Sequence, residues 1–268
     1  MSSKKLRKKH NVQLVDSLWG FLSEVDRIVQ LWNPEGKEHN PWFRGHSQSS
    51  WKLTPKIYRP EFQDIKEDDL RWEFYHLAWP YLSSAAWEPK TDWDWYFLME
   101  HYGLPIRLLD WTESALVALY FALRDTKDKK ENAAVWILNP KVLNQKVAKK
   151  GYLILSTLCD TMKIKGYLPK IDSPLSGTGY PIAIQPELKS FRIAAQQGVF
   201  TLHGKDKQAL DDYAILDQHL VKIEILRSKD SLIKEQLLVA GIGETTVFPE
   251  LSALAQELID YYQYKPSK

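Results

Sequence analysis

Apolar residues recur at steps of three and four along much of the chain, which is the spacing of an amphipathic helix. The helices predicted in this way cover residues 13–32, 68–82, 93–101, 112–124, 228–240 and 249–264. Gly103 and Pro105 follow the third of them, as residues of these types commonly do at the end of a helix. The pattern therefore predicts helices at both ends of the chain and in its middle.

Other segments have the patterns of strands. Residues 133–138 form a continuous apolar run, Ala-Ala-Val-Trp-Ile-Leu, which is typical of a strand covered on both faces. Residues 220–226 alternate between apolar and polar positions, and 197–203 and 41–46 also favour extended structure. Strands interleaved with helices predict an α/β (α+β) fold in which a central mixed sheet is covered by helices.

Length and charge favour one domain without a strong electrostatic character. A chain of 268 residues with 44% hydrophobic residues can bury one large core. We expect a basic tail over residues 1–12 and a single domain over 13–268. The cationic run in the tail could contact phosphates, although such runs are more often solvated. The formal net charge of +2 neither requires nor excludes a nucleic-acid partner.

The remaining composition suggests a reducing compartment. Cys159 is the single cysteine, so no disulfide can form within the chain. No apolar segment is long enough for a membrane span or for the core of a signal peptide, and we expect a cytoplasmic protein with no membrane partner. No spacing of histidines or acids converges on a metal site, so none is expected.

The first candidate for function is the sequence Phe-Arg-Gly-His at 43–46, at the end of a predicted strand. The guanidinium of Arg44 is always charged and has the geometry to bind phosphate or carboxylate, and His46 lies beside it. The alternative is a structural ion pair between Arg44 and an acid such as Asp110 or Glu73.

The second candidate is the polar segment at 100–112, predicted to be a loop between two helices. It contains residue types suited to acid–base chemistry, anion binding and stacking: His101, Tyr102, Arg107, Asp110, Trp111 and Thr112. Each also has a structural explanation. His101 would favour a helix C-terminus, Asp110 or Thr112 could cap the next helix, and Trp111 could be core.

The third candidate is the segment at 191–203, where two amides and a glycine precede a strand. Gln197 could face a ligand at the edge of the sheet. Alternatively, Arg192 and Gln196 pair four residues apart on a helix and have no other role.

Taken together, these motifs resemble those of the FRG-domain family, which is named for its Phe-Arg-Gly motif. The resemblance rests on Phe43-Arg44-Gly45-His46, on the run from His101 to Thr112, and on later segments that include Gln197-Gly198 and Phe248-Pro249; it spans residues 41–251. Ile106 stands where threonine is more usual in the family.

The arrangement is also similar to that of ADP-ribosyltransferases. That similarity implies that Arg44 binds the phosphates of NAD and that His101 or Tyr102 orients a ribose. Gln197 would then stand where those enzymes use a catalytic glutamate, and an amide cannot supply its charge. The acid would have to come from elsewhere, with Asp110 the first candidate, or the site would bind a nucleotide without cleaving it.

Two functions follow as hypotheses. In the first, the protein binds, and acts chemically on, a nucleotide or other phosphorylated ligand around Arg44 and residues 101–112, with NAD-dependent ADP-ribosyl transfer as one form of this activity. The proposed catalytic residues are His101, Asp110 and Gln197; the proposed ligand-binding residues are Arg44, His46, Tyr102, Arg107, Trp111 and Thr112. In the second, a non-catalytic module binds nucleic acid or protein, with a role in phage defence or stress, and the 11 Trp and 13 Tyr residues supply stacking surfaces.

Overall fold

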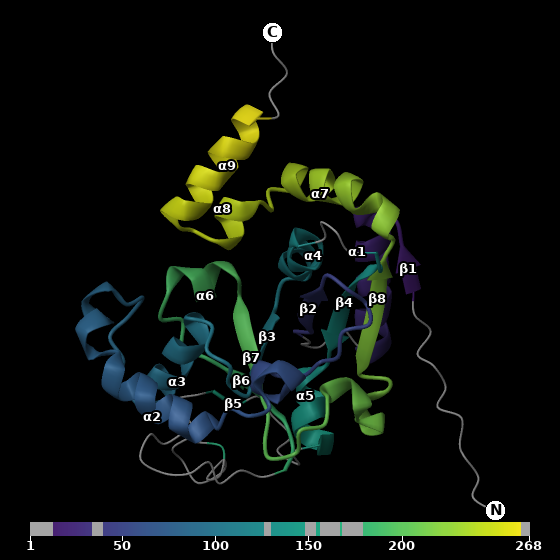
Figure 1. Ribbon diagram of the computed structural model, residues 1–268. Coiled ribbons are helices and arrows are strands. Elements are labelled where there is room, and N and C mark those ends of the chain that lie inside the picture. Colours follow the sequence, from purple (N-terminus) through teal and green to yellow (C-terminus); the bar gives the residue numbers. More distant parts are fainter. Residues whose placement is uncertain are drawn as a thin grey trace, which may run out of the picture.

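The strands form one mixed sheet that runs through the molecule (Figure 1). The computed structural model describes residues 13–33, 40–125, 130–147, 154–155, 167 and 179–263. Within these residues the sheet has eight strands in the order β1-β8-β4-β2-β3-β7-β6-β5. Their bounds are Gln13–Val15 (β1), Trp42–His46 (β2), Leu108–Thr112 (β3), Ala133–Leu138 (β4), Ile154–Leu155 (β5), Ile182–Gln185 (β6), Gly198–Leu202 (β7) and Leu220–Ile225 (β8). The pairs β1–β8 and β5–β6 are parallel and the others are antiparallel, which confirms the predicted α/β fold with a mixed sheet.

Helices surround the sheet, and in the described residues the six predicted helices are present together with three short ones. Their bounds are Leu18–Trp32 (α1), Glu67–Leu77 (α2), Asp92–His101 (α3), Ala115–Arg124 (α4), Pro140–Val142 (α5), Phe191–Ala195 (α6), Asp230–Val239 (α7), Glu244–Val247 (α8) and Leu251–Gln263 (α9). Among the described residues, no helix has the length and apolar character needed to cross a bilayer. The cationic tail and Cys159 lie outside the described residues.

Two segments differ in kind from the prediction. Residues 13–15 form a strand, not the start of a helix, because they pair in parallel with β8, and Ser17 then caps α1 with its hydroxyl. The segment at 108–112 is an inner strand of the sheet and not a loop. Its Ser114 caps α4, so neither Asp110 nor Thr112 has the capping role that was considered for it.

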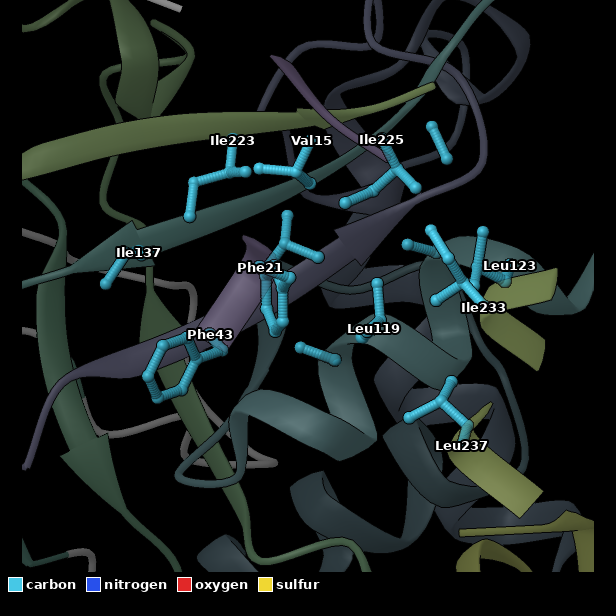
Figure 2. Close-up of a cluster of buried hydrophobic side chains, with 14 of the residues drawn as sticks. Val15, Phe21, Phe43, Leu119, Leu123, Ile137, Ile223, Ile225, Ile233 and Leu237 are labelled. Carbon is cyan, nitrogen blue, oxygen red and sulfur yellow. The ribbon is translucent and has the colours of Figure 1, made fainter. Parts of the chain in front are cut away.

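One face of the sheet packs against α1, α4 and α7. Figure 2 shows this cluster, in which Phe21 of α1, Leu119 of α4 and Ile233 of α7 meet inward-facing strand residues such as Ile137 and Ile223. Further along the same face, α3 covers β3, β7 and β6 through a second cluster that includes Phe97 and Phe200. The opposite face is covered by short helices and loops through a third cluster that includes Trp42, Trp111 and Trp136.

Strands β2 and β3 are joined by a single backbone pair. Phe43 pairs with Thr112, whereas β2 pairs with β4 along its whole length and β3 pairs with β7 along its whole length. The two strands therefore diverge beyond Phe43. This divergence leaves an edge of β3 without a strand partner in the middle of the sheet, beside α4.

Gly45 lets α4 lie directly on β2. A Cβ atom at this position would overlap the carbonyl oxygen of Ala118 and the backbone nitrogen of Ala122 in α4. Because these are backbone atoms, no side-chain rotation could relieve the overlap. The glycine of the Phe-Arg-Gly motif thus has a packing role on one face of β2, while Arg44, its neighbour in the strand, points to the other face.

Candidate functional site

A cavity of about 360 Å³ lies where β2 and β3 diverge. It is enclosed by β2, β3 and β7, by the C-terminal end of α3 and by α4 and α6. Its lining residues are Phe43, Arg44, Gly45, Ser47, Trp51, Glu100, His101, Asp110, Trp111, Thr112, Phe121, Asp125, Arg192, Ile193, Gln196, Gly198 and Phe200. The volume falls at the lower end of the range of small-molecule sites, which is about 300 to 1,000 Å³. Arg44 and part of the segment at 101–112 therefore lie around one shared space.

Arg44 bridges the gap between the two strands. Its Nη1 donates to the carbonyl oxygen of Asp110 at 2.6 Å and lies 3.4 Å from the Asp110 carboxylate. The guanidinium thus takes the place of a backbone N–H that β2 would otherwise offer to β3. Arg44 thus forms the ion pair with Asp110 that was considered as its structural role, and it also lines the cavity.

His46 lies behind Arg44 and does not line the cavity. Its Nε2 accepts a hydrogen bond from Nε of Arg44 at 3.2 Å, which requires an unprotonated nitrogen. Burial, followed by the charges of Arg44 and Arg59, lowers the pKa of His46 from 6.5 to about 3. His46 is therefore neutral at physiological pH and orients the guanidinium. A second histidine, His203, is fully buried, and burial likewise lowers its pKa to about 3.

These two histidines predict a loss of stability in acid. Their pKa is lowered by folding, so the unfolded chain binds more protons between pH 6.5 and about 3, and stability falls as the pH decreases through this window. At pH 5 each histidine should reduce the free energy of unfolding by about 2 kcal/mol relative to pH 8. The melting temperature measured from pH 8 to pH 4 should fall less steeply for His203→Gln than for the wild type. Exposed His76→Gln is the control, and equal slopes in all three proteins would contradict the prediction.

Two carboxyl groups face each other inside the cavity. Asp110 stands in the middle of β3 with 56% of its side chain exposed, into the cavity, and Glu100 comes from the last turn of α3. Their side chains are hydrogen bonded to each other. Burial, followed by the charge of Asp110 and this hydrogen bond, raises the pKa of Glu100 well above its ordinary range. Burial also acts to raise the pKa of Asp110, but the hydrogen bond from Glu100 and the charge of Arg44 outweigh it and hold the pKa low.

Three other predicted residues line the cavity. His101 is half-buried at the end of α3, where burial and the charge of Arg192 lower its pKa and Glu250 opposes them. Trp111 is buried, and its Nε1 donates to the hydroxyl of Thr201 at 3.1 Å. The Thr112 hydroxyl donates to the carbonyl oxygen of Gln196 at 2.6 Å. The polar groups of Trp111 and Thr112 are thus occupied within the protein.

Besides His46, three predicted residues lie outside the lining. Arg107 is 2% exposed and forms an internal network: its Nε lies 3.4 Å from the carboxylate of Glu67, and its other nitrogens donate to the carbonyl oxygens of His203 and Tyr167. Tyr102 is exposed, and its hydroxyl accepts from the backbone of Ala86. Gln197 is exposed at the turn before β7, with a positive φ of 47°. Its neighbour Gln196 is the amide that lines the cavity.

The cavity also contains residues that sequence reasoning did not select as site residues. Glu100 is a half-buried acid at the end of α3, and the seven residues before it are buried. An acid that directly follows so apolar a segment could have been selected as a site residue from the sequence. Arg192 was interpreted only as a helix-surface partner of Gln196. In the structure its guanidinium lies over the ring of Phe248, 5.0 Å from the centroid, and Arg124 lies over the same ring at 4.3 Å. Phe248 thus holds Arg192 beside the cavity.

The fold and site define a mixed α/β protein with a polar cavity that carries two guanidinium groups and a pair of carboxyl groups. The family model of the FRG domain matches residues 39–131. The chain therefore contains an FRG domain, as its motifs implied. The match includes Arg44, Glu100 and Asp110 and ends before β4, so Arg192 and Gln196 lie outside it.

Searches of curated proteins and of solved structures found no match to this chain. The similarity to ADP-ribosyltransferases accordingly gains no support from these comparisons. Among the described residues, no group of three or more histidines, cysteines or acids could hold a metal ion.

Proposed function

We propose that the cavity binds a nucleotide or another small phosphorylated ligand. The observation that carries this proposal is that two guanidinium groups, those of Arg44 and Arg192, line one cavity together with several aromatic rings. Guanidinium groups pair with phosphate oxygens through two parallel hydrogen bonds, and aromatic rings such as Phe43 and Phe121 offer surfaces for a base. The two carboxyl groups hold a single proton between them, so this pair offsets only one of the two guanidinium charges.

Of the two arginines, Arg192 is the better test of ligand binding. Arg44 supports the split edge of β3, so its removal would also disturb the sheet. Arg192 is held by its contact with Phe248 and does not support the edge of β3. We expect Arg192→Gln to weaken the binding of a phosphorylated ligand about 10- to 100-fold, which is the effect of losing one charged hydrogen-bonding partner.

The measurement is a thermal-shift screen of adenosine, guanosine, cytidine and uridine monophosphates, ADP-ribose and NAD, followed by calorimetric titration of those that stabilise the protein. The control is Arg27→Gln on the outer surface of α1, which should bind like the wild type. The proposal fails if none of these compounds stabilises the wild type, or if Arg192→Gln and Arg27→Gln bind equally well.

NAD-dependent ADP-ribosyl transfer is a narrower form of this proposal. Its support is the ionised carboxylate of Asp110, which would supply the negative charge that Gln197 lacks. The size of the cavity suits one mononucleotide half better than a whole dinucleotide. NAD therefore belongs in the screen, but the monophosphates are expected to fit best.

A second candidate function is the binding of single-stranded nucleic acid on the outer surface. Trp72 in α2 is 55% exposed, and Trp79 and Tyr81, which follow α2 in the chain, are 57% and 71% exposed. Exposed rings of this kind can stack on bases. Binding of a labelled oligonucleotide that weakens steeply with salt and with Trp79→Ala, but not with Arg192→Gln, would favour this function. A role in phage defence or stress stays a prediction from the sequence.

A further inference from the structure

The two carboxyl groups in the cavity must share one proton. Ionised carboxylates only accept hydrogen bonds, so the bond between the Glu100 and Asp110 side chains exists only if one of them is protonated. Arg44 lies 3.4 Å from Asp110 and donates to the same residue's carbonyl, which favours negative charge on Asp110. The proton therefore belongs to Glu100.

The other charged groups near the pair do not change the assignment of the proton to Glu100. Arg192 faces Glu100 from α6 and Arg44 faces it from β2, and both favour its ionised form. Burial and the negative charge of Asp110 outweigh them, so the pKa of Glu100 is still raised. The cavity thus presents a neutral acid and an ionised carboxylate side by side, a division of roles that enzymes use for acid–base catalysis.

We propose, building on the function above, that Glu100 and Asp110 are catalytic residues that cleave the bond between the sugar and the base of a purine or pyrimidine nucleoside 5′-monophosphate. Arg192 would hold the phosphate, and the aromatic wall would hold the base. A neutral base leaves readily only when its nitrogen receives a proton, and the sugar left behind carries positive charge in the transition state. Both requirements are met by this one pair of side chains. The nicotinamide of NAD is already positively charged and leaves without a proton, so it has no need of such an acid.

The step is balanced with water as the co-reactant. Glu100 gives its proton to the base as the bond between C1′ and the base nitrogen breaks, and the electron pair of that bond leaves with the base. Asp110 stabilises the positive charge on the sugar. Water then forms a bond to C1′ and gives a proton to Asp110, and this proton returns to Glu100 through their hydrogen bond. The products are the free base and ribose 5-phosphate.

The closeness of the pair also predicts the stereochemistry. In enzymes that invert the configuration at C1′, the two carboxyl groups lie on opposite faces of the sugar, about 6.5 to 9.5 Å apart. Hydrogen-bonded groups are much closer than this and leave no room between them for an attacking water, so the pair has the closer type of spacing found in enzymes that retain the configuration. We therefore expect water to add on the side that the base has left, with retention of the configuration at C1′.

The test measures release of free base from AMP, GMP, CMP and UMP by chromatography. We expect Glu100→Gln and Asp110→Asn each to slow release by about 100-fold or more, while Glu88→Gln, an exposed acid in the segment before α3, leaves it unchanged. With methanol in place of water, the methyl riboside formed should keep the configuration of the substrate. Melting curves of each variant show whether it is folded.

Each outcome decides the proposal. A monophosphate that stabilises the protein without being cleaved, release that is insensitive to Glu100→Gln, or an inverted methyl riboside would overturn it and leave the binding function intact. If no monophosphate either binds or is cleaved, both proposals fail. Should neither variant fold, the wild-type rate decides: it must fall as the pH rises through the raised pKa of Glu100, and a rate that instead rises throughout would exclude Glu100 as the acid.

Discussion

Gly45→Ala should destabilise the protein by about 3 kcal/mol, because the added methyl group would overlap the backbone of α4 at Ala118 and Ala122. Neither the strand nor the helix can yield alone, since β2 is paired with β4 along its length and α4 is packed into the main core. Chemical denaturation of the variant measures the effect. Gly179→Ala is the matched control, because nothing lies near its added Cβ. Equal stability of the two variants would show that α4 can move away from β2.

The second large effect is expected at Arg107, which sequence reasoning assigned to ligand binding. Arg107→Met should lower the free energy of unfolding by about 3 kcal/mol, because the buried carboxylate of Glu67 would lose its cation and two carbonyl oxygens would lose a donor. Ligand affinity should not change once the variant is folded. Denaturant unfolding and the nucleotide titration together test this. A variant with normal stability and no ligand binding would contradict this prediction and show that Arg107 acts in ligand binding.

Removing the carboxylate as well should recover part of the loss. In Glu67→Gln/Arg107→Met no uncompensated charge is left in the interior, so the double variant should be more stable than Arg107→Met alone. Arg27→Met, an exposed arginine, controls for the substitution itself. If the double variant is less stable than the single one, the carboxylate is stabilised by other partners, such as the hydroxyl of Tyr96.

Most of the fold could be predicted from the hydrophobic pattern. The strand at 133–138 is apolar throughout, and the helices over 18–32 and 115–124 each bury an apolar face. These features are visible in the local spacing of apolar residues. β3 was missed because Asp110 interrupts the apolar run of an inner strand with a charge. The charge is tolerated there because β2 diverges from β3 and Arg44 fills the gap. This arrangement depends on tertiary contacts, which the local sequence pattern does not contain.

The site was predicted in part for the same reason. Arg44, His101 and Asp110 were selected from residue type alone, and the structure brings them around one cavity. The partners of these residues could not be read from spacing: Glu100 meets Asp110 only because α3 and β3 pack together, and Arg192 reaches the rim only through Phe248. Gln197 is exposed at the turn before β7, whereas its neighbour Gln196 lines the cavity, and the sequence pattern does not distinguish these two amides.

Because β2 and β3 are joined only by the backbone pair between Phe43 and Thr112, the sheet consists of two halves with little hydrogen bonding between them. One half contains β1, β8, β4 and β2, and the other contains β3, β7, β6 and β5. Arg44 and Gly45 in the first half and Asp110, Gly198 and Phe200 in the second are walls of the same cavity. A ligand that contacts both walls would link the two halves of the sheet. Its binding would therefore reduce the motion of one half relative to the other.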